Sequence, residues 1–382
     1  MAFLGPIALN IYAPIMPTLK VALSSSADAV QLGMTLFLIF FALGQLSCGL
    51  FVELFGQKKV LLSGVAIYIL GSILGIIAND IYWLILARVL QATGGGFSLL
   101  LTRSIILEQN SPNKAAAKLS YIALGIASLQ AIVPTLSGYL NVHFSWHLVF
   151  YVSLVMALVA WWAIYRYLPI ITLPQYNSAK PLSIKEIIKT YLHVLVFPRF
   201  FYLALANALI SAGFFVFVLN VPFIVAESLA GNSLDYGKWY LVVALGFWLG
   251  SFIASQISER IGANAMLKLG WCIATLAAFF MTAFVIVYGI SYWSLFIPMT
   301  LFTFGRGISL PNAQASAVTV TSSKRSTAMG VFSFCQLIIG AALAQFSVML
   351  VKQNVLLLPI VISLLAVLAL LAYFKAIKIN IG

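Results

Sequence analysis

The chain has 382 residues, of which 63% are hydrophobic and only 8% are charged. An ordinary soluble domain carries about 25% charged residues, so this composition excludes a soluble globular protein and indicates a chain surrounded mostly by lipid. The net charge of +13 does not indicate a nucleic-acid partner, because membrane proteins concentrate lysine and arginine in their cytoplasmic loops.

Apolar stretches long enough to cross a bilayer follow one another along the whole chain. A membrane-spanning helix needs about 20 mostly apolar residues. Twelve stretches meet this need, at residues 2–22, 29–54, 59–78, 81–107, 115–140, 145–168, 200–228, 238–261, 264–288, 291–320, 326–349 and 353–377. The sequence therefore predicts an all-α membrane protein with twelve transmembrane helices.

One connecting segment, residues 169–199, is longer than the others and divides the chain near its midpoint. We expect it to join two pseudo-symmetric bundles of six helices, residues 1–168 and 200–382. Its second part has the pattern of an amphipathic helix, which should lie along the inner membrane surface. The apolar face of this predicted helix holds Ile184, Ile187, Ile188, Tyr191, Leu192 and Leu195, opposite Lys185 and Lys189.

Basic residues set the predicted orientation of the spans. Most lysines and arginines fall at one side of the predicted bundle, whereas Lys20, Lys238 and Lys352 fall at the other. Because cytoplasmic loops carry an excess of basic residues, we expect the side rich in lysine and arginine to be cytoplasmic. Both chain ends are then cytoplasmic as well.

Two arginines, Arg88 and Arg306, fall inside predicted spans. A charge near the middle of a bilayer costs several kcal/mol unless it is paired or hydrated, so it marks a polar cavity by default. Gln91 follows Arg88 by three residues and shares its helix face. We expect Arg88 and Gln91 to line a substrate or proton pathway, with Arg306 as a second cationic wall. A snorkelling or structurally paired arginine is the alternative at both positions.

A pattern of glycine and glutamate recurs in the two halves of the chain with identical spacing. Both copies lie at the inner end of the second span of a six-span half. The two copies are Gly44, Glu53 and Gly56, and Gly250, Glu259 and Gly262. Internal repeats are common in transporters, whose substrate site lies at the interface between the repeats, so this pattern favours a transporter built from two related halves.

Four segments of the sequence resemble motifs of a known family. GLFVELFGQKKVL, at residues 49–61, resembles the loop signature of the major facilitator superfamily, with Glu53 where aspartate is usual. NIYAPIMPTL at residues 10–19 and ARVLQATGGG at residues 87–96 resemble motifs of its bicyclomycin-resistance (Bcr/CflA) drug-efflux subfamily. AIVPTLSGYL, at residues 131–140, is similar to the antiporter signature. The resemblance covers nearly the whole chain.

The resemblance implies a secondary transporter that exports drug-like small molecules by alternating access, coupled to proton entry. We expect a monomer in the bacterial inner membrane. The sequence has no phosphate-binding loop, metal-ligand spacing or nucleophile elbow, so we expect no cofactor, no metal and no enzymatic activity. A facilitator or importer of a small neutral or anionic metabolite is the alternative, followed by a non-transporting receptor or scaffold.

Substrate-binding candidates are the polar and aromatic residues expected to line a cavity within the spans. They are Asn10, Tyr12, Arg88, Gln91, Gln130, Phe214, Phe217 and Arg306. Two cationic walls without a buried acid suit neutral or anionic substrates better than cations.

Proton coupling has few candidates in this sequence. Asn10 stands where the resembling subfamily usually has an aspartate, and asparagine does not titrate near neutral pH. None of the eight acidic residues lies in the middle of a predicted span. Glu227, near the outer end of the seventh span, is the nearest carboxylate candidate for proton coupling, and a solvated interfacial residue is the alternative.

The resemblance also implies a gate at the inner side. It implies that Glu53 contacts the start of the eleventh span, where a carboxylate near a helix N-terminus gains about 0.3–2 kcal/mol, and that Glu259 does the same at the fifth. These contacts would hold the inner side closed while the outer side is open. The alternative is that the charged residues only keep the loop soluble and set its topology. The gating candidates are Gly49, Glu53, Gly56, Lys58, Lys59, Pro134, Gly138, Glu259 and Gly262.

Overall fold

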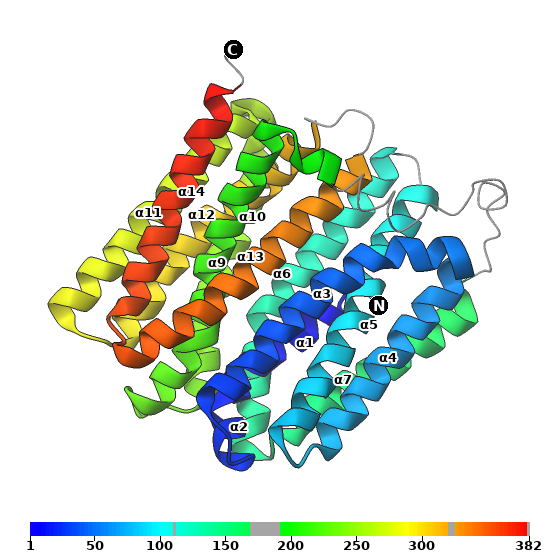
Figure 1. Cartoon of the computed structure of the whole chain (residues 1–382), viewed down its shortest axis with the longest axis horizontal. Helices are drawn as coiled ribbons and strands as arrows, with labels where there is room; N and C mark the ends of the chain where they lie inside the picture. Colours follow the sequence, from blue (N-terminus) through cyan, green and yellow to red (C-terminus); the bar gives the residue numbers. More distant parts are fainter. Residues whose placement is uncertain (110–111, 169–191, 320–324, 380–382) are drawn as a thin grey trace. The chain divides into compact units, whose positions relative to one another are not determined.

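The computed structural model of the chain describes residues 1–109, 112–168, 192–319 and 325–379 (Figure 1). These residues are helical almost throughout and include no β-strand. The chain divides into two compact units, Met1–Ile187 and Ile188–Gly382. Most of the expected amphipathic linker helix lies outside the described residues. Of its predicted apolar face only Leu192 and Leu195 are described, and both lie in a short helical segment.

The first unit begins with a span that is broken by proline. Pro14 lies in the 3-10 turn η1 and Pro17 lies in the first turn of the helix that follows. Proline lacks a backbone N–H and fits without loss of a hydrogen bond only in the first turn of a helix, so the continuous helix expected at residues 2–22 becomes three pieces. The elements are α1 (Leu4–Tyr12), η1 (Ala13–Ile15), α2 (Met16–Ala22), α3 (Ala27–Phe55), α4 (Gln57–Ile77), α5 (Ile81–Gln109), α6 (Pro112–His143) and α7 (His147–Tyr167).

The second unit contains long helices that match the predicted spans within a few residues. Its most complete cap is at the start of α10, where the Asn232 side chain accepts from the backbone of Asp235 and the Asp235 side chain accepts from that of Asn232, a reciprocal capping box. The elements are α9 (Pro198–Glu227), α10 (Ser233–Ile261), α11 (Ala263–Tyr288), α12 (Tyr292–Thr319), α13 (Arg325–Gln353) and α14 (Leu357–Lys378).

Length and composition identify nine helices in the described residues that can each cross a membrane. They are α3, α4, α5, α7, α9, α10, α11, α13 and α14. This finding confirms the expected all-α membrane fold and is consistent with the twelve predicted spans.

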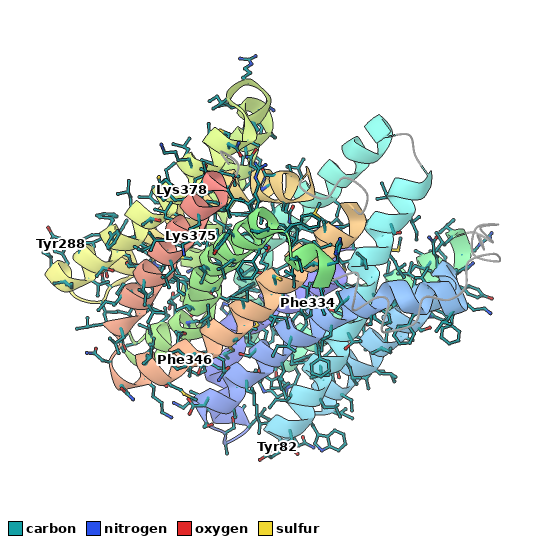
Figure 2. The ribbon with its side chains drawn as sticks, turned by 45° about the horizontal axis from the view of Figure 1, so that its top comes forward. Tyr82, Tyr288, Phe334, Phe346, Lys375 and Lys378 are labelled. Atoms are coloured by element: carbon teal, nitrogen blue, oxygen red, sulfur yellow. The ribbon has the colours of Figure 1, made fainter. Side chains whose placement is uncertain are left out.

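The surface of the helices is apolar and their interior holds charge, the reverse of a soluble protein. Tyr82, Tyr288 and Phe346 are 80%, 73% and 58% exposed, and Figure 2 shows Tyr288 and Phe346 at the outside of the second unit's helices. Arg88 and Arg306, in contrast, are only 0% and 5% exposed. Lipid solvates apolar side chains and does not solvate charge, so this distribution is what a bilayer requires.

The duplicated glycine pattern forms the same turn in both units. Gly56 joins α3 to α4 with φ 81° and ψ 155°, and Gly262 joins α10 to α11 with φ 89° and ψ 147°. Only glycine adopts this region without strain. The Gly56 N–H donates to the Val52 carbonyl at 2.8 Å and the Gly262 N–H donates to the Ser258 carbonyl at 2.9 Å. The repeat seen in the sequence is therefore a repeat in backbone conformation.

Three consecutive glycines in α5 each face a different helix. A Cβ on Gly94 would lie 2.8 Å from the Tyr68 backbone nitrogen of α4, and one on Gly95 would lie 2.7 Å from Cα of Gly5 in α1. A Cβ on Gly96 would lie 2.7 Å from the Phe41 carbonyl oxygen of α3. Helices approach this closely only where side chains are absent, so α5 is the central packing element of the first unit.

Helix α12 repeats this packing in the second unit, with one change. Gly305 faces Ala274 of α11, where an added Cβ would lie 2.7 Å from the backbone nitrogen, and Gly307 faces Ser251 of α10 at 2.9 Å. Gly305 and Gly307 thus correspond to Gly94 and Gly96. The residue between them is Arg306, so an arginine stands in the register position that Gly95 has in α5.

Candidate functional site

Arg88 is held by a chain of hydrogen bonds that runs from α5 to α4. Its Nη1 donates to Gln91 Oε1 at 2.8 Å, and Gln91 Nε2 donates to Ser72 Oγ at 3.0 Å. The Ser72 hydroxyl in turn donates to the Tyr68 carbonyl at 3.0 Å. All of these side chains are buried, so the chain fixes both the position and the rotation of the guanidinium.

Two aromatic rings cover the Arg88 guanidinium. The Arg88 Cζ atom lies 4.4 Å from the ring centroid of Tyr12 and 4.2 Å from that of Phe37. The Tyr12 hydroxyl donates to the Val30 carbonyl at 3.0 Å, which holds its ring in place. Cation–π contacts of this kind stabilise a desolvated cation by up to about 2 kcal/mol.

The remaining donors of Arg88 have no acceptor in the described part of the chain. Its Nε and Nη2 atoms are buried and form no hydrogen bond with any described residue. A buried donor without an acceptor costs about 1–3 kcal/mol, and more when it is charged. Arg88 is therefore a buried cation whose charge the described part of the first unit leaves uncompensated.

Arg306 is the corresponding cation of the second unit. Its Cζ atom lies 4.5 Å from the ring centroid of Phe214 in α9 and 5.2 Å from that of Phe247 in α10. Its Nε atom is buried and has no hydrogen-bond partner among the described residues. Phe247 was not among the predicted site residues. It lies in an apolar helix nine residues after Lys238, and the sequence around it does not distinguish it from other core aromatics.

The two arginines do not occupy equivalent positions in the repeat. Arg306 corresponds to Gly95, which lies seven residues after Arg88 in α5, and seven residues are about two helical turns or roughly 10 Å. Arg306 thus lies on the same helix face as Arg88 but two turns further toward the C-terminal end. The sequence predicted two cationic walls at these arginines, and the register shows that the two residues lie at different depths of their helices.

Neither Phe217 nor Gln130 has a hydrogen bond or cation–π contact with Arg88 or Arg306 within the described residues. The Phe217 ring is fully buried against Phe296 of α12, with ring centroids 5.4 Å apart, and Gln130 is half-buried on α6. Phe214 alone of the predicted second-unit aromatics contacts a buried charge.

Asn10 bonds to its own helix. Its Nδ2 donates to the Pro6 carbonyl at 2.8 Å, four residues back. The second unit has a counterpart in Asn220, whose Nδ2 donates to the Val216 carbonyl at 2.8 Å and to Ser347 Oγ at 3.0 Å. Sequence reasoning missed Asn220, because the residues around it share little with those around Asn10.

Polar contacts also dock α6 onto the first span. The Ser137 hydroxyl donates to the Ile11 carbonyl at 2.5 Å, and Asn141 Nδ2 donates to Thr18 Oγ1 at 2.7 Å. Pro134 lies inside α6, and both it and Gly138 are buried. The segment that resembles the antiporter signature is therefore fastened to α1 through Ser137.

The gating candidates occupy several different environments. The Lys58 ammonium donates to the carbonyls of Tyr165 at 3.1 Å and Leu168 at 2.6 Å, where a cation satisfies the last carbonyls of α7. Lys59 and Gly49 are exposed. Glu53 and Glu259 lie in the last turns of α3 and α10, and their side chains are outside the described part of the structure.

The carboxylate expected to couple protons is at a helix end. Glu227 is the last residue of α9 and is exposed.

Within the described residues, no group of three histidine, cysteine or acidic side chains gathers in a way that could hold a metal ion. Arginine, glutamine, serine and aromatic groups make up the two buried sites described above.

Comparison with known proteins points to one family. The family described as Major Facilitator Superfamily matches residues 1–345. The bicyclomycin resistance protein homolog of Haemophilus influenzae is 23% identical, over 89% of this chain and 85% of that protein. Multidrug resistance protein D of Escherichia coli is 21% identical, over 97% and 92%. The crystal structure of a D-xylose–proton symporter superposes with a TM-score of 0.78 at 14% identity, covering 98% of this chain and 95% of that one.

Proposed function

Because the chain belongs to the Major Facilitator Superfamily, we propose that it is a secondary transporter that exports drug-like small molecules in exchange for protons. Transport by a multi-pass membrane protein is the general activity of the family. Export of drugs is supported by the names of relatives that cover nearly the whole chain, one for bicyclomycin and one for multidrug resistance. Residues 1–168 and 200–382 would act as the two halves that alternate access, joined by residues 169–199.

The observation that carries this proposal is the buried, incompletely bonded guanidinium in each unit. Arg88 and Arg306 together leave three buried N–H-bearing atoms without a described acceptor, namely Nε and Nη2 of Arg88 and Nε of Arg306. A structural arginine in a membrane protein is normally paired. An arginine that keeps free donors inside a spanning unit is better explained by a ligand that supplies the acceptors. Asn10, Tyr12, Gln91, Gln130, Phe214 and Phe217 are the further residues we propose to face the substrate.

The charge of these sites favours neutral or anionic substrates. Within the described residues, neither arginine forms an ion pair with a carboxylate, so the field at both sites is positive. A cationic drug would be repelled there, whereas a molecule with carbonyl or oxyanion groups would satisfy the free donors.

For proton coupling we propose Glu227, because Asn10 cannot carry a proton near neutral pH. An exposed carboxylate at the end of α9 can exchange protons with water directly.

We also propose that the protein works as a monomer in the bacterial inner membrane, with both termini in the cytoplasm. The basic residues at the inner loop ends support this orientation.

Transport by purified protein in liposomes tests the proposal. With an imposed pH gradient, we expect accumulation of neutral and anionic compounds from a drug-like panel, and no accumulation when the gradient is collapsed. Glu227→Gln should abolish gradient-driven accumulation but retain exchange of labelled for unlabelled substrate, because only the coupling step loses its carboxylate. A preference for lipophilic cations would contradict the substrate class.

A facilitator or importer of a small neutral or anionic metabolite is the second candidate. The observation that favours it is the lack of a carboxylate in the middle of any described helix, where a proton carrier would be most effective. Equal rates of flux with and without the pH gradient in the same liposomes would select this candidate over the exporter.

We further propose that the duplicated turns at Gly56 and Gly262 form part of the inner gate, with Glu53 and Glu259 as the groups that hold it. The identical backbone conformation of the two turns supports a shared role. Gly49, Lys58 and Lys59 flank the first turn, and Pro134 and Gly138 shape α6. A change of about 1.4 kcal/mol would shift the ratio of inward-open to outward-open states about tenfold.

The gate proposal predicts that Glu53→Gln shifts this ratio toward the inward-open state without unfolding the protein. Labelling of single cysteines placed at the inner and outer loop ends measures the ratio, and Asp80→Asn is the matched control because Asp80 caps α5 at the other side of the bundle. The proposal fails if Glu53→Gln and Asp80→Asn give the same ratio as the unsubstituted protein.

A further inference from the structure

The free donors of Arg88 lie on a single edge of its guanidinium. In arginine, the Nε–H and one Nη2–H point in parallel from the same side of the planar group, while Nη1 lies on the other side. Nη1 is the atom that donates to Gln91, and Nε and Nη2 are the atoms without an acceptor. One edge is thus bonded to the protein, and the other edge has no acceptor among the residues that the structure describes.

We propose that this Nε–Nη2 edge is the binding site for a carboxylate, so that the transported substrates of this protein are organic carboxylates. The inference rests on the proposed transport function and narrows its substrate class. The two parallel N–H groups match the two oxygens of a carboxylate, which they bind as a fork with two charge-assisted hydrogen bonds.

The bonds on the committed edge determine where the fork points. Gln91 holds Nη1, and Gln91 is itself held by Ser72, which bonds to the backbone of α4. Rotation of the guanidinium about its side chain would break the first of these bonds. Gln91 is therefore a positioning residue, and the fork is oriented before a ligand arrives, which lowers the entropic cost of binding.

The aromatic rings restrict how a ligand can approach. Tyr12 and Phe37 lie over the guanidinium at 4.4 and 4.2 Å, and the Tyr12 hydroxyl is occupied with the Val30 carbonyl. A ligand therefore reaches Arg88 in the plane of the guanidinium, at the free edge, with its apolar part beside the rings. This arrangement favours a carboxylate attached to an apolar or aromatic body.

The fork also discriminates against the closest neutral isostere. A primary amide has the shape of a carboxylate but offers one acceptor oxygen and one N–H₂ group, and the latter would face an N–H donor of the arginine. One donor would remain unpaired and the buried charge would remain uncompensated. A carboxylate avoids both costs.

Calorimetric titration of the full chain in lipid nanodiscs tests the proposal with two probes, naphthoate and naphthamide. We expect naphthoate to bind about tenfold or more tightly than naphthamide, since one charge-assisted pair is gained and one mismatch is avoided. Arg88→Lys keeps the charge but removes the fork, and it should reduce this ratio to near one. Arg166→Lys is the matched control, because it makes the same change at an exposed arginine at the end of α7, and it should leave the ratio intact.

The outcomes separate this inference from the proposed function. Equal binding of the two probes by the unsubstituted protein overturns it, as does failure of naphthoate to bind, and neither result depends on whether a variant folds. A ratio that survives Arg88→Lys also overturns it. If naphthoate binds through Arg88 but no compound is moved in liposomes, the carboxylate site stands and the proposed transport fails. If neutral drugs are transported without any preference for carboxylates, the transport function stands and the carboxylate site fails.

Discussion

Replacing Arg306 with methionine is expected to stabilise the protein and to impair transport at the same time. An arginine at the centre of a spanning helix costs about 2.5–3.5 kcal/mol relative to an apolar residue, and its two cation–π contacts, at about 1 kcal/mol each, return only part of this. Methionine fills a similar volume between Phe214 and Phe247 without a charge. We expect a net stabilisation of about 1 kcal/mol, seen as a rise of a few degrees in melting temperature.

Transport should fall at least about tenfold in the same variant, because the loss of a charged anchor for the substrate costs more than about 1.4 kcal/mol. Initial rates in liposomes measure this loss, and scanning fluorimetry of the same preparation measures the melting temperature. Arg166→Met is the control, since Arg166 is exposed at the end of α7 and exposed substitutions usually change stability by less than about 0.5 kcal/mol.

A substitution that raises stability and lowers activity identifies a functional residue that destabilises the fold. If Arg306→Met melts at a lower temperature than the unsubstituted protein, Arg306 is a structural residue and the binding interpretation is wrong. Unchanged transport in a stabilised variant would instead show that the arginine contacts no substrate.

Replacing Gly94 with valine is expected to prevent the first unit from assembling. An added Cβ would lie 2.8 Å from the Tyr68 backbone nitrogen and also against the Gly64 carbonyl. Overpacking a core normally costs about 1–3 kcal/mol, and here the cost is larger because backbone atoms cannot move away by changing a rotamer. We expect little or no monodisperse protein in size-exclusion chromatography after detergent extraction.

Gly330→Ala is the control for this substitution. Gly330 lies within α13, and an added Cβ there has no atom within 4 Å. Alanine in a helix is favoured over glycine by about 0.5–1 kcal/mol, so this variant should melt at the same or a slightly higher temperature. A folded, fully active Gly94→Val protein would show that α4 and α5 do not pack as closely as described.

Much of the fold could be predicted from the sequence because lipid imposes a simple rule on it. Every backbone polar group in a bilayer must be bonded within its own segment, so each long apolar stretch becomes a helix and the predicted spans agree with the observed helices. The prediction went wrong locally at residues 2–22, where Pro14 and Pro17 interrupt the helix. Hydropathy does not register this break, because proline in an apolar stretch leaves the average almost unchanged.

The site was harder to predict, because it depends on contacts between helices. Burial of Arg88 and its link to Gln91 follow from helix periodicity, since the two residues are neighbours on one face. The bond from Gln91 to Ser72 and the cover from Phe37 depend on how α5 packs against α4 and α3, and a single sequence carries no signal for such pairs. Phe247 was missed for the same reason.

The repeat was predicted from one triplet in each half, and packing extends it. Gly94 and Gly96 in α5 have the same neighbours in their unit as Gly305 and Gly307 have in theirs. The sequence alone did not reveal this register. It makes Arg306 the equivalent of Gly95, two helical turns away from the position equivalent to Arg88. The two arginines therefore occupy non-equivalent positions of the repeat.

That difference gives the two units unlike packing at one register position. Gly95 brings the backbone of α5 against Gly5 of α1, and a junction between two backbones has no rotamers through which it can yield. In the second unit the same register holds a long side chain lying under Phe214 of α9, so α9 and α12 are separated by groups that can rearrange. At this register position the packing of the second unit can therefore rearrange through side-chain rotamers, whereas that of the first unit cannot.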